Sequence, residues 1–425
     1  MLDINKIRDE KEEVEKALLK RMEAGSFDLE EIIKLDDKRK ELIQRADELK
    51  AERNKFSKTK PTPEIIEEMK KVGERIKEMD EKLAKIEEEL KEKLSALPNI
   101  PAPDVVAGGK ENNKVLKTFG KRPEFGFKFK DHVELATSLG LIDYERAAKM
   151  SGAGFWCYTG DGAMLEWALL NYFVDFHKKN GYEFLLLPYL LNEASAYASG
   201  HLPKFREDLF WVLASSSTSR SGEDGLCLDA TSEMMINNFH RDDILNGEDL
   251  PKKYYSYSAC FRREAGSYRK EERGMVRGHQ FNKIEMFQFT KPEDSWKAFD
   301  ELVKNAEELV KGLGLNFQTV QLAAEDASAA MAKTIDIEVW IPSMNTYKEV
   351  SSVSNALDYQ ARRANIRYKN ENGKNEFVHT LNGSGLATSR LIPAILEQFQ
   401  NEDGSVNVPE VLQGMVGKKR LEIRN

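Results

Sequence analysis

Apolar residues recur alternately four and three positions apart through much of the first hundred residues. The clearest series runs from Ile65 to Leu90, and a related series runs from Ile32 to Phe56. Such a heptad repeat predicts two helices that pack along a shared seam, as in a coiled coil. Between them lie residues 58–63, whose prolines end one helix and start the next. The pattern therefore predicts an antiparallel helical hairpin over about residues 28–97.

Beyond the hairpin the pattern becomes mixed. Prolines within residues 97–103 end the helical region. Apolar runs predict strands over 182–188, 254–262, 280–289, 335–340 and 347–352, and helical periodicity predicts helices over 164–180, 294–313 and 385–400. Helices and strands joined by hairpin-like links indicate an α+β fold, in which helices flank an antiparallel sheet. We expect two domains, an all-α N-terminal arm over 1–103 and a second domain over 110–425.

Charge changes the interpretation of the hairpin. Charged residues make up 32% of the chain and are concentrated in its first hundred residues, so the outer helix faces are expected to be solvated. A net charge of -8 argues against nucleic-acid binding through bulk charge but leaves local basic patches open. The hairpin is therefore either a spacer or dimerisation coil, which periodicity alone favours, or an arm that reaches a large partner.

The cysteines and the termini indicate a compartment. Cys157, Cys227 and Cys260 lie far apart without metal-ligand spacing, as expected of reduced cytosolic thiols. The N-terminus has no apolar signal core, and no apolar run approaches the length of a membrane span. We expect a cytoplasmic protein with no membrane partner.

The strongest chemical signal is the run Phe261-Arg262-Arg263-Glu264-Ala265-Gly266, followed by His279-Gln280-Phe281. In a strand, Arg262 and Glu264 would share one face because side chains alternate. A nucleotide needs such a pair, a cation for a phosphate and an acceptor for the adenine amino group, and Phe281 could stack on the base. The alternative is a charged hairpin without a ligand, and the triplet alone favours that alternative.

Four further segments carry polar residues where a buried strand would not favour them. They contain Thr231-Ser232-Glu233, Glu285, the run from Glu349 to Asn355, and the run from Asn382 to Arg390. Glu349 and Ser352 offer the hard oxygen ligands that suit magnesium beside a phosphate. A Gly-Ser-Gly turn at 383–385 is expected to open a helix, so that Arg390 near its start reaches a phosphate. Together these segments favour a nucleotide site, although each has a structural explanation by itself.

Three regions resemble the signature motifs of class II aminoacyl-tRNA synthetases. The run from Phe261 to Glu285 resembles the second motif, the run from Asn382 to Arg390 resembles the third, and the helix–strand pair ending at Pro188 resembles the first. Residues 336–342, 349–355 and 358–363 are similar to the seryl-tRNA synthetases in particular. The N-terminal hairpin is also typical of that family, so the resemblance covers nearly the whole chain.

The resemblance implies a serine–tRNA ligase that forms seryl-adenylate from L-serine and ATP and transfers the seryl group to the 3′ end of tRNA(Ser). It implies a class II catalytic sheet, a homodimer and a need for Mg2+, and it leaves tRNA(Sec) open as a second acceptor. Arg262, Glu264 and Arg390 are the implied catalytic residues, at the α-phosphate, the adenine amino group and the γ-phosphate. The implied ATP site comprises Arg262, Arg263, Glu264, Phe281, Glu349, Val350, Ser351, Ser352 and Arg390, with Glu349 and Ser352 on the metal. The implied serine site comprises Thr231, Ser232, Glu233, Glu285, Asn382 and Ser384.

By the same resemblance the hairpin becomes a tRNA-binding arm. Candidate phosphate contacts near its predicted tip are Lys50, Arg53, Lys55, Lys58, Lys60, Lys70 and Lys71. The segments 228–233 and 323–335 depart from the usual family pattern. Two other functions stay open: an adenylate-forming paralogue that loads serine onto a carrier, and an inactive tRNA-binding protein. The retained arm argues against the first, and the retained nucleotide-binding residues argue against the second.

Overall fold

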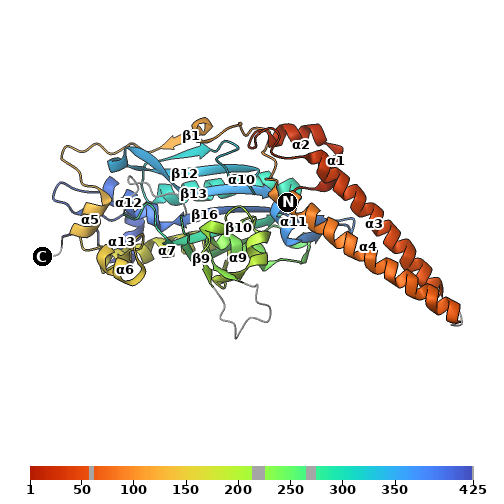
Figure 1. Ribbon diagram of the computed structural model, residues 1–425. Coiled ribbons are helices and arrows are strands. Elements are labelled where there is room, and N and C mark those ends of the chain that lie inside the picture. Colours follow the sequence, from red (N-terminus) through yellow and green to blue (C-terminus); the bar gives the residue numbers. More distant parts are fainter. Residues whose placement is uncertain (57–61, 213–224, 265–273, 424–425) are drawn as a thin grey trace. The chain divides into compact units, whose positions relative to one another are not determined.

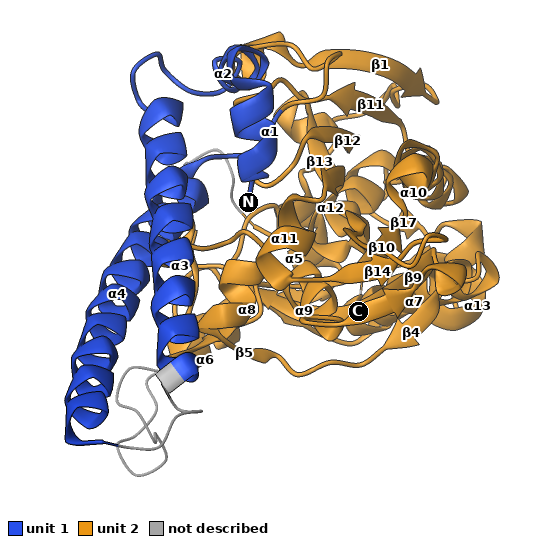
Figure 2. Cartoon of the chain, turned by 90° about the vertical axis from the view of Figure 1, so that its right-hand side faces the viewer, with its two compact units in different colours: residues 1–100 blue, residues 101–425 orange. Residues whose placement is uncertain are grey.

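The computed structural model describes residues 1–56, 62–212, 225–264 and 274–423. The chain divides into two compact units, residues 1–100 and residues 101–425 (Figures 1 and 2). In the described residues, no helix is both long and apolar enough to cross a membrane.

Unit 1 is all-helical. Two short helices, α1 (Ile4–Asp9) and α2 (Lys11–Leu18), precede the long helices α3 (Leu29–Phe56) and α4 (Pro63–Ala96). The long helices run antiparallel, because ion pairs join Lys93 to Glu31 at 2.8 Å and Lys50 to Asp80 at 3.3 Å. The seam that the heptad pattern predicts is buried at Ile32, Leu35, Ala46, Val72, Ile76 and Leu90, and positions between them, such as Leu42 and Leu83, are half-buried.

One buried carboxylate lies at the base of unit 1. Asp36 of α3 is fully buried and pairs with Arg8 at 2.9 Å and with Arg39 and Lys40 at 2.8 Å each. Burial opposes ionisation of Asp36, but the hydrogen bonds from Lys40, Arg39 and Arg8 lower its pKa to about 2. The carboxylate therefore stays charged and connects α1 to α3.

Unit 2 is built on an eight-stranded sheet with the order β1-β11-β12-β13-β16-β10-β9-β4. Every neighbouring pair is antiparallel except β4 and β9, which are parallel. In that order the strands are β1 (Lys114–Phe119), β11 (Phe317–Gln321), β12 (Lys333–Ile341), β13 (Thr346–Leu357), β16 (His379–Ala387), β10 (Gln280–Thr290), β9 (Lys252–Phe261) and β4 (Glu183–Leu185). The predicted α+β class is confirmed, since helices flank this sheet (Figure 1).

Three longer helices pack on the sheet: α7 (Asp161–Lys179), α10 (Ser295–Gly312) and α12 (Thr388–Gln398). Shorter helices are α5 (His132–Ser138), α6 (Tyr144–Ser151), α8 (Glu193–Ala198), α9 (Ser232–Phe239), α11 (Tyr359–Ala364) and α13 (Glu410–Val416). Small sheets are formed by β2 (Ile142–Asp143) with β3 (Cys157–Tyr158), by β5 (Leu190–Asn192), β7 (Leu226–Leu228) and β6 (Trp211–Val212), by β15 (Asn375–Phe377), β14 (Arg367–Lys369) and β8 (Ile244–Asn246), and by β17 (Val406–Asn407) with β18 (Arg420–Leu421).

Two of the four polar segments do not have the local structure that the sequence predicts. Residues 383–385 lie inside β16, and the helix begins only at Thr388. Because β16 pairs with β13 on one side and β10 on the other, the chain stays extended there, and a Cβ on Gly385 would approach His177 Nε2 to 2.3 Å. The triplet at 231–233 is also no strand: Thr231 caps α9 by accepting from the amide of Glu233.

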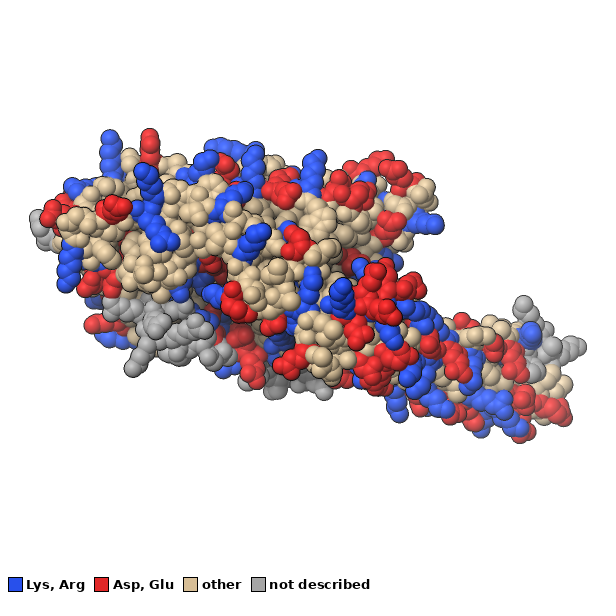
Figure 3. All heavy atoms as spheres, turned by 90° about the horizontal axis from the view of Figure 1, so that it is seen from above, with Lys and Arg blue, Asp and Glu red and all other residues tan. Residues whose placement is uncertain are grey.

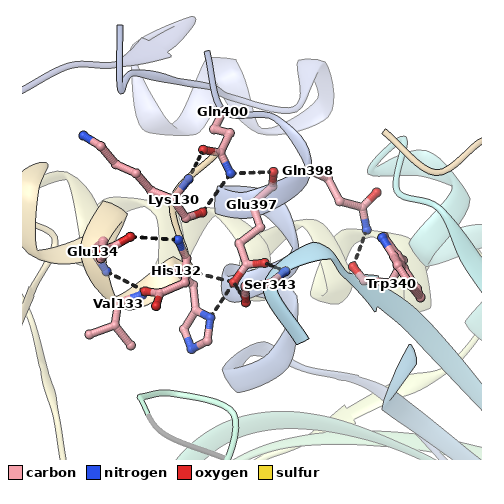
Figure 4. A network of polar contacts seen from close by, with 10 residues as sticks. Lys130, His132, Val133, Glu134, Trp340, Ser343, Glu397, Gln398 and Gln400 are labelled. Carbon is pink, nitrogen blue, oxygen red and sulfur yellow. Dashed lines mark hydrogen bonds and ion pairs between the residues drawn. The ribbon is translucent and has the colours of Figure 1, made fainter. Parts of the chain in front are cut away.

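A buried polar network fixes the carboxyl end of α12 (Figure 4). Glu397 is fully buried and accepts from the His132 amide at 2.9 Å and from His132 Nδ1 at 2.7 Å. The amide and hydroxyl of Ser343 each donate to the same carboxylate at 2.7 Å. Gln400 Oε1 accepts from the Lys130 amide at 2.8 Å. The far end of α12 is therefore tied to α5 and to the segment after β12.

Candidate active site

A pocket opens in unit 2. Its walls come from the chain that follows β9, from β10, β13 and β16, and from the start of α12. The lining residues are Arg262, Glu264, Val276, Arg277, Gly278, Phe281, Lys283, Glu349, Val350, Ser384, Ala387, Ser389 and Arg390. Seven of the fifteen residues expected at the ATP and serine sites are among them: Arg262, Glu264, Phe281, Glu349, Val350, Ser384 and Arg390.

Arg262 and Glu264 reach the pocket by a route that differs from the expected one. The strand β9 ends at Phe261, and the next residues leave the sheet because the Arg263 amide donates to the Asp208 carbonyl at 2.9 Å. Glu264 has a φ of 51°, a left-handed conformation that is uncommon outside glycine. The expectation of a continuous strand is therefore wrong, yet both side chains line the pocket. Arg263 is exposed and lies outside the lining.

Charged side chains at the open end of the pocket are paired with one another. Arg277 donates to Glu264 through Nε at 2.8 Å and lies 2.5 Å from it through Nη2. Arg390 Nη1 lies 3.3 Å from the Glu349 carboxylate and donates to the Glu349 carbonyl at 2.8 Å. The Arg262 guanidinium lies 5.3 Å from the centre of the Phe281 ring. Since the four paired side chains are between 22% and 43% exposed, a polyanionic ligand can replace their partners.

More carboxylates gather beside Glu349. Asp336 and Glu338 of β12 lie opposite Ser352 and Glu349 of β13, and the Ser352 hydroxyl donates to Asp336 at 2.7 Å. Burial, followed by the charge of Glu349, raises the pKa of Asp336 well above its ordinary value. Burial also raises the pKa of Glu338. Such crowded oxygen atoms favour a hard cation, although no protein-only cluster of three metal-binding side chains occurs among the described residues.

The inner end of the pocket is organised around Lys283. Its ammonium donates to the Thr231 hydroxyl at 2.6 Å and forms an ion pair with Glu285. Glu285 also accepts from Asn382 Nδ2 at 3.2 Å. Burial by itself would lower the pKa of Lys283, but the Glu285 charge holds it above its ordinary value. The structure thus brings two of the expected serine-site residues, Thr231 and Glu285, together on one buried cation, and Asn382 joins them through Glu285.

Glu233 lies behind this cluster and is held by Gln360, whose Nε2 donates to it at 2.6 Å. Burial, then the charge of Glu285, raises the pKa of Glu233 to about 7. Ser232 is directed elsewhere, because its hydroxyl donates to Ser258 at 2.7 Å. Ser351 is buried and donates to the Ser384 carbonyl at 2.6 Å, so Ser232 and Ser351 support the walls and do not line the pocket.

Sequence reasoning missed two lining residues that carry charge, Lys283 and Arg277. Lys283 could have been found, because it alternates with Phe281 and Glu285 along β10 and strand neighbours two apart share a face. Arg277 gives no such signal, because it lies outside any strand and meets Glu264 only through the fold.

The candidate tRNA contacts of unit 1 lie where α3 ends and α4 begins. Arg53, Lys55, Lys70 and Lys71 are exposed, whereas Lys58 and Lys60 lie outside the described residues. Lys50, which precedes Arg53 by one turn of α3, is paired with Asp80. Acidic and basic side chains are interspersed along the hairpin surface (Figure 3), so no single sign of charge covers it.

Known proteins share both the sequence and the fold. Residues 1–101 match the family described as seryl-tRNA synthetase N-terminal domain, and residues 211–399 match the tRNA synthetase class II core domain (G, H, P, S and T). The chain is 53% identical over 431 residues to serine–tRNA ligase 2 of Clostridium acetobutylicum, which covers 99% of this chain and 100% of that protein. It is 44% identical to the serine–tRNA ligase of Macrococcus caseolyticus, over 98% of this chain and 99% of that protein. The solved structure of seryl-tRNA synthetase from Pyrococcus horikoshii complexed with ATP superposes with a TM-score of 0.89 at 33% identity, covering 100% of both chains.

Proposed function

Because the chain belongs to the family of seryl-tRNA synthetases, we propose that it activates L-serine with ATP and transfers the seryl group to tRNA(Ser). One observation carries the proposal: a single pocket reaches from partly exposed cations, which can change partners, to buried Lys283, whose ion-pair partner Glu285 lies outside the lining. The open end suits a triphosphate, which needs several cations. The buried end suits a zwitterion, because its ammonium and its carboxylate each need a partner of opposite sign.

The chemistry places specific demands on the two ends. When the serine carboxylate attacks the α-phosphate, two anions approach each other, and fixed positive charge lowers that barrier. We assign this role to Arg262, whose Nε donates to the Ala230 carbonyl at 3.2 Å and so holds the guanidinium at the junction. No general base is needed, because the serine carboxylate is already ionised at neutral pH.

Residue roles follow from position. Glu264 accepts from the adenine amino group, Phe281 stacks on the base, and Arg390 binds the γ-phosphate. Lys283 and Glu285 bind the polar groups of serine, with Glu233 facing its ammonium. A site that offers partners to the serine hydroxyl leaves them unpaired when alanine enters, which penalises alanine strongly.

The carboxylates of Asp336, Glu338 and Glu349 support a Mg2+ site at the pocket wall formed by β13. Glu349 is 43% exposed at the pocket, and Ser352, three residues later on β13, donates its hydroxyl to Asp336 on the neighbouring strand. We propose that Glu349 and Ser352 hold the ion, with phosphate and water as its other ligands. When bound, the ion neutralises phosphate charge, and the release of Glu349 frees Arg390 for the nucleotide.

A homodimer is supported by apolar side chains that the single chain leaves exposed. Trp167 and Met164 on α7 are 57% and 47% exposed, and Leu186 beyond β4 is 74% exposed. Large exposed apolar side chains grouped on adjacent elements mark interaction surfaces. Sedimentation of the wild type and of Trp167→Glu tests this proposal. We expect a dimeric wild type and a monomeric variant, and a monomeric wild type would contradict the proposal. We expect the protein to act in the cytoplasm, because its proposed substrates are found there.

Pyrophosphate–ATP exchange tests the activation step. We expect exchange that depends on serine and is lost in Arg262→Ala. If the wild type shows no exchange with serine, threonine or alanine, the proposed function is wrong.

Charging of purified tRNA separates a ligase from an enzyme that loads a carrier. Reversing Arg53, Lys55, Lys70 and Lys71 to glutamate should reduce charging strongly and leave exchange unchanged, because these residues belong to unit 1 and the pocket is lined by unit 2 alone. Reversal of four other exposed lysines of the arm, Lys34, Lys38, Lys77 and Lys85, is the matched control. A tRNA(Sec) transcript in the same assay defines the acceptor range.

A further inference from the structure

A buried carboxyl that the proposed chemistry does not use lies directly behind the pocket. Glu166 of α7 is 3% exposed, and its Oε1 accepts from Asn282 Nδ2 at 2.7 Å and from the Thr388 hydroxyl at 2.6 Å. Asn282 belongs to β10 and Thr388 is the first residue of α12. One oxygen atom of α7 therefore holds two other elements at once.

The two donors are immediate neighbours of pocket residues. Asn282 lies between Phe281 and Lys283, and both of these line the pocket. Thr388 precedes the lining residues Ser389 and Arg390. A change in the separation of the two donors would move the wall formed by β10 relative to the guanidinium on α12.

Backbone pairing cannot fix that separation alone. The ladder between β10 and β16 shifts register after Lys283, which pairs with Ala387, and the paired residues end there. Asn282 and Thr388 come just beyond this last pair, where the Thr388 hydroxyl also lies 3.2 Å from the Asn282 carbonyl. The side-chain bonds to Glu166 thus continue the connection at the point where the ladder stops.

The helix that carries Glu166 is itself held against the sheet. His177 lies eleven residues later on the same face of α7, since eleven residues make about three turns. Its Nε2 donates to the Gly385 carbonyl of β16 at 2.7 Å. On the sheet side, the Tyr257 hydroxyl donates to Asn282 Oδ1 at 3.0 Å. Glu166 and its partner Asn282 are therefore each held in place by a further hydrogen bond nearby.

We propose that Glu166 is a positioning residue of the ATP site, which sets the separation of β10 from α12 by binding Asn282 and Thr388 together. This inference rests on the proposed function, because ATP is the ligand whose base and γ-phosphate would contact the two walls. It predicts an effect on ATP use that exceeds any effect on serine use.

The ionisation of Glu166 supplies an independent signature. Burial raises its pKa to about 7, against the hydrogen bonds from Thr388 and Asn282. The titratable groups that face it are Tyr158 of β3 and Tyr257 of β9. Burial raises the pKa of Tyr158 well above its ordinary value and raises the pKa of Tyr257 to about 12. Because both tyrosines remain protonated near neutrality, Glu166 is the member of this group that titrates there. Its ionised form accepts stronger bonds, so kcat/KM for ATP should rise with pH through about 7.

Steady-state exchange kinetics of Glu166→Ala and Glu166→Gln test the inference. We expect Glu166→Ala to raise KM for ATP by about tenfold or more, the effect of losing shared bonds to a buried acceptor, and to change KM for serine less. Glu166→Gln keeps an acceptor oxygen and should restore KM for ATP to within about threefold, but without the pH-dependent component near 7. An Ala variant with wild-type KM for ATP, in a protein that catalyses exchange, overturns the inference. A wild type without exchange overturns the proposed function instead.

A double-mutant cycle identifies the bond itself. Thr388→Val removes one donor, and if both residues act through one contact, Glu166→Ala combined with Thr388→Val should be no worse than Glu166→Ala alone. Effects that multiply would contradict a shared contact. If Glu166→Ala does not fold, Thr388→Val tests the inference instead: we expect it to raise KM for ATP severalfold, and an unchanged KM would overturn the inference. Glu397→Gln, at the far end of the same helix, is the control: it should lower Tm and leave KM for ATP unchanged. If KM for ATP rose as much in this variant as in Glu166→Ala, the cause would be a general loosening of α12.

Discussion

The two ends of the pocket contain similar charges but hold them differently. At the open end, Arg390 and Glu349 are 31% and 43% exposed. At the inner end, Lys283 and Glu285 are 6% and 1% exposed. An exposed pair contributes only about 0–1 kcal/mol, so a ligand can separate it at little cost. A buried pair cannot lose one partner without leaving a desolvated charge.

This difference suggests a division of labour. Under the proposed function, the pairs at the open end would exchange their members for phosphate and metal when the nucleotide binds. The inner end would keep its charges in fixed positions before serine binds, because Thr231 and Asn382 hold Lys283 and Glu285 from either side. Preorganised groups need no rearrangement during the reaction. The comparison can be broken by removing one charge at each end.

The largest effect is expected from Lys283→Met. This change leaves Glu285 and Glu233 without their shared cation, so serine-dependent exchange should fall by about a thousandfold or more and the free energy of unfolding by about 3–5 kcal/mol. Chemical denaturation and exchange assays measure the two effects. Adding Glu285→Leu should recover stability without recovering exchange. A single variant as stable as the wild type would show that the inner charges are not desolvated as the structure indicates.

Arg390→Ala tests the open end. We expect KM for ATP to rise about ten- to a hundredfold, because a charge-assisted contact to phosphate is lost, while the free energy of unfolding changes by less than about 1 kcal/mol. Exchange kinetics at varied ATP concentration measure the first effect, and chemical denaturation measures the second. Arg390→Lys, which retains the charge but not the fork, should lie between the two. A loss of stability comparable to that of Lys283→Met would remove the distinction between the ends.

The sequence predicted the parts of the molecule that depend on local pattern. The seam of α3 and α4 follows directly from heptad spacing, since burial recurs at Ile32, Val72 and Leu90 as expected. Strands β9 and β10 were also predicted almost at their observed bounds. The residues predicted for the nucleotide site, several of which line the pocket, were singled out because charged side chains beside apolar strands are unusual.

Features that depend on distant contacts were missed. Glu166 is indistinguishable from a surface glutamate by local pattern, because its partners Asn282 and Thr388 lie 116 and 222 residues away. The strand at 383–385 was mistaken for a turn, since Gly-Ser-Gly favours turns unless two neighbouring strands hold it extended. Glu264 was placed in a strand although its backbone is left-handed. In each case tertiary contacts override local preference.

A pH dependence should appear at the inner end. Glu233 has a pKa raised to about 7, so it is increasingly protonated below pH 7 and then loses its attraction for the serine ammonium. KM for serine should therefore rise about tenfold between pH 8 and pH 6, as expected for one proton and a pKa near 7. Glu233→Gln should have a high KM for serine with a flat profile. A wild-type KM for serine that is constant over this range would exclude an ionised Glu233 as the ammonium partner.

The smallest effect is expected from Arg277→Gln at the open end. Arg277 pairs with Glu264, and if that pair yields to the adenine amino group, its removal should cost little. The free energy of unfolding should change by less than about 1 kcal/mol and KM for ATP by less than about threefold. Glu264→Gln removes the acceptor and is the matched variant, with a larger rise in KM for ATP. If Arg277→Gln were the more damaging of the two, the ion pair would itself be part of the ATP-binding structure, and the open end would be as fixed as the inner one.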